Sequence, residues 1–157
     1  MYEETKMEKL TINLPPVELG RIDILVEAGY YHNRTEFIRA AIRKTLDSHQ
    51  DFIDSQIKEY QKIFEEDKQK KDKKFVATFS MGVIGLSKSH FERALAEGKK
   101  VKLLVIGLLS IDKEVSAELI LKSVDYIRVF GVLKATPEVK SALNRIKNES
   151  EKNKENV

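Results

Sequence analysis

The feature of this 157-residue sequence that most limits its fold is a short strand pattern near the N-terminus. In "KLTINLPP", residues 9–16, polar and apolar side chains alternate until two prolines stop the pattern. No hairpin partner follows it. A lone strand leaves its backbone hydrogen-bonding groups unpaired and its apolar face uncovered. We therefore expect it to pair with the same strand of a second copy of the chain.

Two helices are predicted after this strand. Pro15 and Pro16 end the strand and suit the first turn of a helix, which needs no amide donors. Apolar residues at helical spacing follow, and Gly29 suits the C-terminus of that helix. Asn33 is predicted to cap a second helix, with Glu36 three residues later as in a capping box.

Residues 9–47, and above all "LTINLP" and "RIDILVEAGYYHNRTEFIRAAIR", resemble the ribbon-helix-helix DNA-binding family of the Arc, MetJ and CopG repressors. Asn33 stands where serine is commoner in that family, and both residues cap helices. The resemblance implies a homodimer whose paired strands enter the major groove of double-stranded DNA. The net charge of residues 9–48 is only +1, so charge alone does not indicate a DNA-binding protein.

The resemblance also implies roles for individual residues. Side chains on the polar face of the ribbon would contact base edges: Lys9, Thr11 and Asn13. The start of the second helix and the segment before the ribbon would contact phosphates: Lys6, Asn33, Arg34 and Thr35. The apolar faces would form the dimer core: Leu10, Ile12, Leu14, Phe37, Ile38 and Ile42.

The middle of the chain is amphipathic. No Gly or Pro interrupts residues 34–74, so we expect the second helix to continue into this segment, which ends in the charged linker "DKQKKDKK". A seam at heptad-like spacing comprises Leu46, Ile53, Ile57, Tyr60 and Phe64. Two interpretations are open: a coiled coil between two copies, which we favour, or a helix packed on its own C-terminal domain.

The second half contains a threefold internal repeat. "FSMGVIGLS", "LVIGLLSID" and "RVFGVLKAT" align on Gly82, Gly107 and Gly131, which are 25 and 24 residues apart. A residue type that caps helices stands five positions after each glycine, namely Ser87, Asp112 and Thr136. Each unit is thus predicted to be a strand, a cap and a helix, and the strands to form a parallel sheet covered by helices. The glycine is predicted to mark a bend or a close approach.

The predicted fold class is α/β, with four regions. These are a ribbon-helix-helix dimer over residues 1–48, an extended amphipathic helix and charged linker over 49–74, a three-unit strand-helix repeat for assembly or effector binding over 75–146, and a disordered tail over 147–157. A sheet of three strands leaves its two edge strands exposed, so we expect the chain to form dimers or a higher oligomer.

Several classes of function are disfavoured. The chain has no cysteine, and His32, His49 and His90 lack ligand spacing, so nickel sensing and other cofactors are not expected. No nucleophile motif or phosphate loop indicates an enzyme. No apolar run is long enough for a membrane span, and we expect a cytoplasmic protein.

We expect the protein to be a sequence-specific, DNA-binding transcriptional regulator that acts as a repressor. Two alternatives remain open: an antitoxin of a toxin-antitoxin pair, or an architectural protein that coats DNA. The sequence identifies neither the operator nor any small-molecule effector.

Overall fold

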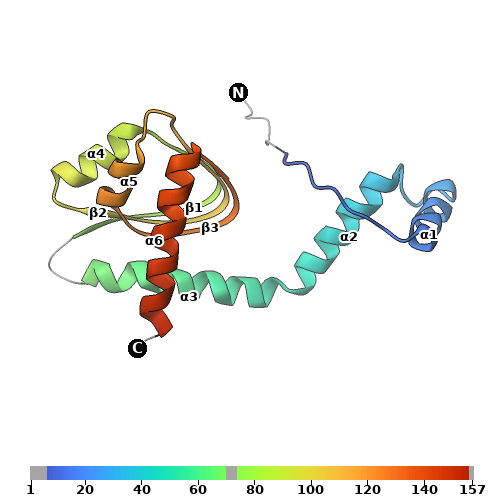
Figure 1. The fold of residues 1–157 in the computed structure, drawn as a ribbon. Helices are drawn as coiled ribbons and strands as arrows, with labels where there is room; N and C mark the ends of the chain where they lie inside the picture. The colour runs from blue at the N-terminus through green and yellow to red at the C-terminus, as the bar shows by residue number, and fades with distance from the viewer. Residues whose placement is uncertain (1–6, 70–73, 156–157) are drawn as a thin grey trace, which may run out of the picture. The chain divides into compact units, whose positions relative to one another are not determined.

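The computed structural model describes residues 7–69 and 74–155, which form two compact units (Figure 1). The first unit comprises the residues up to Asp54, and the second begins at Ser55. Each unit is described by itself.

Helix α1, Pro16–Glu27, follows the sequence prediction at both ends. Pro15 precedes it and Pro16 occupies its first position. At the other end Gly29 has a φ of 80°, and the amides of Gly29 and Tyr30 donate to the carbonyls of Val26 and Leu25 at 3.0 Å each. This pair of bonds is a Schellman motif, which a residue with a Cβ would strain.

The second helix does not continue through the middle of the chain, and our prediction of an unbroken helix is wrong. Helix α2, Arg34–Ser48, ends before α3, Gln50–Gln69. Side-chain hydroxyl groups donate hydrogen bonds to backbone carbonyls near the end of α2. Thr45 donates to the carbonyl of Ala41 at 2.9 Å, and Ser48 donates to that of Thr45 at 2.7 Å. Side chains that compete for backbone acceptors in this way bend or end helices. The amide of His49 then bonds the carbonyl of Leu46, a tighter turn than the α-helical one.

The second unit contains a parallel three-stranded sheet in the order β1-β2-β3, as predicted. The strands are β1, Phe75–Leu86; β2, Lys100–Ile111; and β3, Val124–Lys134. Helices α4, Lys88–Ala96; α5, Ala117–Ser123; and α6, Pro137–Glu155, lie on one side of the sheet (Figure 1). The core lies between sheet and helices, and its completely buried side chains include Phe91, Leu103, Val105, Leu109 and Ile120.

A row of glycines crosses this sheet. Gly82 pairs with Gly107, and Gly107 pairs with Gly131, at φ values of 119°, 134° and 125°. A Cβ on Gly107 would lie 2.1 Å from the carbonyl oxygen of Gly82, and a Cβ on Gly131 would lie 2.1 Å from that of Gly107. The strands curve in Figure 1. A backbone conformation available to glycine alone, repeated in register, bends all three strands together.

The starts of the three covering helices agree only partly with the sequence prediction. Ser87 precedes α4, and the Thr136 hydroxyl accepts a hydrogen bond from the amide of Val139 at 3.4 Å. Asp112, however, does not cap α5. That helix begins at Ala117, and Ser116 caps it by accepting from the amide of Leu119 at 3.2 Å. The Asp112 carboxylate instead accepts from the amide of Glu114 at 3.3 Å, so it shapes a turn before the helix.

Helix α6 runs to Glu155, which differs from the disordered tail predicted from residue 147. Ile146 is buried in the core, and Arg145 and Glu149 form an ion pair of 3.1 Å one turn apart. Anchoring and pairing of this kind favour continuation of the helix. Residues 70–73 of the predicted charged linker lie outside the described residues.

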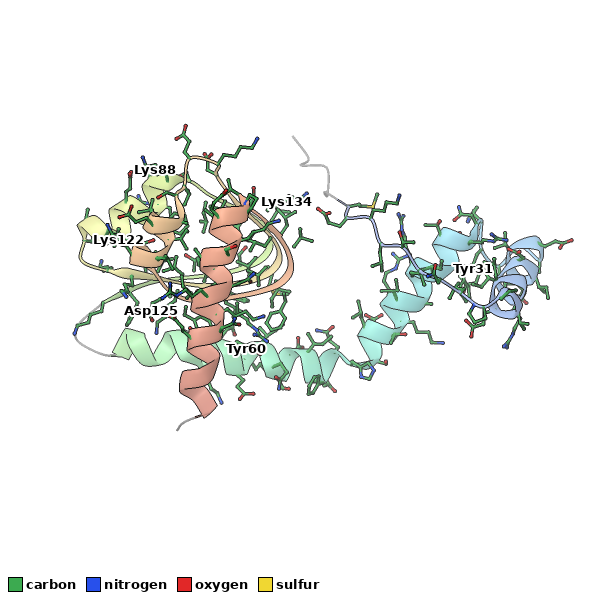
Figure 2. All side chains as sticks on the ribbon, viewed as in Figure 1. Tyr31, Tyr60, Lys88, Lys122, Asp125 and Lys134 are labelled. Carbon is green, nitrogen blue, oxygen red and sulfur yellow. The ribbon has the colours of Figure 1, made fainter. Side chains whose placement is uncertain are left out.

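Tyr60 of α3 packs against the sheet of its own chain. Its ring (Tyr60 is labelled in Figure 2) lies 5.3 Å from the ring of Phe130, edge to face. The Arg128 guanidinium lies 5.8 Å from the Tyr60 ring. This contact corresponds to the second interpretation of the amphipathic segment, in which the helix packs on its own domain. The side chain of Phe64 lies outside the described residues.

Candidate nucleic-acid interface

The segment predicted to form the ribbon is open to solvent. In one chain, residues 7–15 form neither helix nor strand. Lys9, Thr11 and Asn13 are exposed, and so is the apolar Leu10, at 75% of its full accessible surface. An exposed apolar side chain on an extended segment outside any helix or strand indicates a surface that is incomplete in one chain.

An apolar groove lies beside this segment. Its volume is about 420 Å³, and its lining brings together the segment, α1 and α2. The apolar lining residues are Ile12, Leu14, Ile22, Leu25, Phe37, Ile38, Ala41 and Ile42. Five of the six predicted dimer-core residues therefore line one groove, and the sixth, Leu10, is exposed.

The groove is poorly filled by the chain itself. Ile22 is the one buried apolar side chain among residues 7–54, whereas Ile12 and Ile42 remain 46% and 44% exposed. Tyr31 and Phe37 make an edge-to-face contact of 5.2 Å that holds the inter-helix turn against α2. A unit with so little buried surface needs a further covering surface to be stable.

The start of α2 presents backbone amides. The Asn33 side chain accepts a hydrogen bond from the amide of Glu36 at 2.9 Å and so caps the helix, as predicted. In a capping box the glutamate side chain also accepts a hydrogen bond from the amide of the cap residue. Here the Glu36 carboxylate accepts instead from the amide of His32, one residue before the cap, at 2.6 Å. That bond holds the pKa of Glu36 below its ordinary value. The amides of Arg34 and Thr35 make no hydrogen bond with a described residue.

Arg34 has a partner that the sequence did not reveal. Its guanidinium donates to both carboxylate oxygens of Asp23 in α1, at 2.6 and 2.7 Å. The hydrogen bond from Arg34 lowers the pKa of the Asp23 carboxyl, which therefore stays ionised at neutral pH. The pair ties the start of α2 to the middle of α1. The two residues lie eleven positions apart in the sequence and belong to different helices, so helical periodicity does not predict their contact.

The predicted phosphate-contacting residues thus fall into two groups. Asn33, Arg34 and Thr35 lie together at the start of α2, where the helix dipole and unpaired amides favour an anion. Lys6 lies outside the described residues. Within the described part of the chain, no group of three or more His, Asp or Glu side chains could hold a metal ion. No described helix is long and apolar enough to cross a membrane.

Three features together define a class of DNA-binding transcriptional regulators. They are an extended segment of alternating polar and apolar residues, two short helices joined by a glycine turn, and backbone amides presented at the capped start of the second helix. The chain belongs to the Ribbon-Helix-Helix transcriptional regulator family, which it matches over residues 5–140. The match includes most of the second unit as well as the first.

Two relatives resemble a shorter part of the chain. Transcriptional regulator CdrS of Halobacterium salinarum is 38% identical over 45 residues, which cover 29% of this chain and 82% of that protein. Uncharacterized protein MJ1679 of Methanocaldococcus jannaschii is 38% identical over 39 residues, which cover 25% of this chain and 40% of that protein. No solved structure is significantly similar to the chain.

Proposed function

We propose that the protein is a sequence-specific repressor that binds DNA as a homodimer through paired copies of residues 9–14. The observation that carries this proposal is the apolar groove of the first unit, beside which Leu10, Ile12 and Ile42 remain exposed. The same segment of a second copy would cover these side chains. Antiparallel or parallel pairing would also satisfy the backbone groups that one copy leaves unpaired.

Pairing of this kind leaves Lys9, Thr11 and Asn13 of each copy on the outer face of the ribbon. A two-stranded ribbon fits the major groove of DNA. Lysine can donate to guanine, asparagine can form two hydrogen bonds with adenine, and threonine can bond a base or contact a thymine methyl group. We assign base recognition to these three residues.

The start of α2 would hold a DNA phosphate. The amides of Arg34 and Thr35 are available to an anion, and the dipole of α2 favours negative charge at this end. The guanidinium of Arg34 has five N–H donors, of which two bond Asp23, so the others can donate to phosphate. Lys6 would add positive charge. These contacts would fix the position of the ribbon without reading sequence.

The second unit supports an assembly or effector role better than the antitoxin alternative. It has its own core, whereas a toxin-neutralising segment is typically disordered until it binds its toxin. On the outer face of the sheet Phe79, Met81 and Val83 are exposed, and β1 is an edge strand. We propose that this face joins further copies, so that several ribbons occupy neighbouring half-sites with avidity.

The test is DNA binding measured by fluorescence anisotropy across a salt series. One duplex comes from upstream of the protein's own gene, and the other has a random sequence. We expect a clear preference for the first duplex, which the variant Lys9→Ala/Thr11→Ala/Asn13→Ala loses while it keeps its circular dichroism spectrum and its dimer mass in sedimentation. Lys44→Ala, which removes one positive charge from the exposed side of α2, should keep the preference.

Two outcomes would contradict the proposal. Equal binding to both duplexes that falls steeply with salt would identify an architectural protein that coats DNA. Unfolding of the triple variant would mean that Lys9, Thr11 and Asn13 are part of the folded core of the dimer, so they could not face the DNA.

A further inference from the structure

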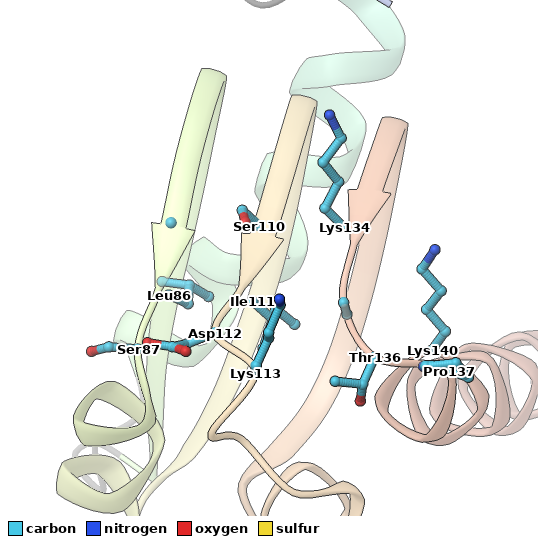
Figure 3. Close-up of a pocket in the computed structure, with 12 residues that line it drawn as sticks. Leu86, Ser87, Ser110, Ile111, Asp112, Lys113, Lys134, Thr136, Pro137 and Lys140 are labelled. Carbon is cyan, nitrogen blue, oxygen red and sulfur yellow. The ribbon is translucent and has the colours of Figure 1, made fainter.

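A large cavity lies in the second unit, at the carboxyl ends of the three strands. Its volume is about 880 Å³ (Figure 3). Its walls come from the ends of β1, β2 and β3 and from the segments that lead into α4, α5 and α6. Parallel strands bring these loops to the same edge of a sheet, and α/β proteins commonly bind ligands at that edge. The volume is within the range of small-molecule sites, about 300–1,000 Å³.

Positive charge predominates in this cavity. Lys113 comes from the loop after β2, Lys134 from the end of β3, and Lys140 from the first turn of α6. Figure 3 shows these three side chains extending in the same direction. Lys113 and Lys140 make no ion pair with a described residue. The carboxylate of Asp112 also lines the cavity, and it already accepts the amide of Glu114.

Hydroxyl groups stand among the lysines. Ser87 precedes α4 but does not cap it, and its hydroxyl bonds that of Ser89 at 2.9 Å. Thr136 precedes α6 and also lines the cavity. A hydroxyl can donate a hydrogen bond to a phosphate or carboxylate oxygen. The dipoles of α4 and α6 add positive potential on the same side, because both helices begin at the cavity.

We propose that this cavity binds a small polyanion, a ligand that carries two or more phosphate or carboxylate groups. Lys113, Lys134 and Lys140 would bind the charged groups, and Ser87 and Thr136 would donate hydrogen bonds to them. Lys113 and Lys140, which make no ion pair with a described residue, repel each other until an anion enters, so an anionic ligand is favoured over a neutral one. This binding site is independent of the proposed DNA interface and uses none of its residues.

The test is NMR titration of the full-length, ¹⁵N-labelled protein, with inorganic pyrophosphate and citrate as separate probes. We expect saturable shifts of amide resonances in residues 85–87, 110–113, 134–136 and 138–140. The double variant Lys113→Gln/Lys140→Gln should weaken binding about tenfold or more, since it removes two charge-assisted contacts. Lys147→Gln removes one charge from α6 outside the cavity and should leave binding unchanged. Tighter binding of pyrophosphate would assign phosphate as the recognised group, and tighter binding of citrate would assign carboxylate.

Three results would overturn the proposal. The first is an absence of saturable shifts in these segments with either probe. The second is equal weakening by Lys147→Gln, which would mean that overall charge attracts the anions. The third is displacement of pyrophosphate by a random DNA duplex, which would make the cavity part of a DNA-binding surface. None of these results depends on whether residues 9–14 read DNA, so the two proposals fail separately.

Discussion

Alanine substitutions along the glycine row should differ in cost according to what each new Cβ meets. At Gly82 a Cβ would meet nothing within 4 Å, but its φ of 119° strains any other residue. A strained backbone conformation costs about 1–3 kcal/mol, so Gly82→Ala should destabilise the second unit by that amount. At Gly107 the same strain is joined by a Cβ 2.1 Å from the carbonyl oxygen of Gly82.

The collision at Gly107 cannot be relieved by rotating a side chain. The opposing atom belongs to the backbone of the paired strand, so β1 and β2 must separate by about 1 Å and lose hydrogen bonds there. We therefore expect Gly107→Ala to cost more than about 4 kcal/mol, which is exceptional for a single substitution. Gly85→Ala is the matched control. Its φ is unstrained and its Cβ would meet nothing within 4 Å, so its effect should stay within about 0.5 kcal/mol.

The assay is native-state hydrogen exchange of the full-length protein, read by mass spectrometry of peptides from the central strand, Lys100–Ile111. The slowest amides of a unit exchange through its complete unfolding, so their protection reports its stability. The expected order of stability is wild type and Gly85→Ala, then Gly82→Ala, then Gly107→Ala. An equal loss for Gly82→Ala and Gly107→Ala would refute the argument that close strand approach, rather than backbone conformation alone, requires the second glycine.

Two further predictions concern one residue in each unit. The substitution Asn33→Ala should remove the cap of α2 and lower the stability of the first unit by about 1 kcal/mol. The loss should be measurable as faster hydrogen exchange of the amides in the first turn of α2. Asn13→Ala is the control, because Asn13 caps no described helix. His90 has a buried ring nitrogen, Nε2, that finds no hydrogen-bond partner among the described residues, and burial lowers the pKa of His90. Because the unfolded chain then binds the proton more readily, stability contributed by neutral His90 should be complete above the unfolded pKa of about 6.5 and decline as the pH falls below it. Thermal unfolding of wild type and His90→Phe between pH 7.5 and pH 5 should show a steeper decline for wild type, and parallel curves would contradict this assignment.

The sequence was informative wherever a structural requirement recurs at fixed spacing. The glycines at 82, 107 and 131 could be aligned from letters alone, and they stand side by side in the sheet. The end of α1 was predictable because a Schellman motif needs a residue such as Gly29 in a left-handed conformation. The groove residues of α2 were predictable because helical periodicity places them on one face.

Other features depend on contacts that no local pattern encodes. The break at His49 follows from hydroxyl bonds of Thr45 and Ser48, residue types that also occur in unbroken helices. The start of α5 required a choice between Asp112 and Ser116, two residues that both suit a cap. The pair of Asp23 and Arg34 forms only because the turn after α1 brings two helices together. The cavity between the strand ends and helix starts is also a product of the tertiary fold.

The thinly filled groove beside residues 9–14 has a consequence for how the protein would respond to its own abundance. In a single copy, Ile22 is the one buried apolar side chain among residues 7–54, so assembly and folding of this unit would be coupled under the proposed dimer. The concentration of the DNA-reading form would then rise with the square of the monomer concentration while monomers predominate. A gene controlled by this protein would respond as if to a threshold, with little repression until enough chains had accumulated to find one another.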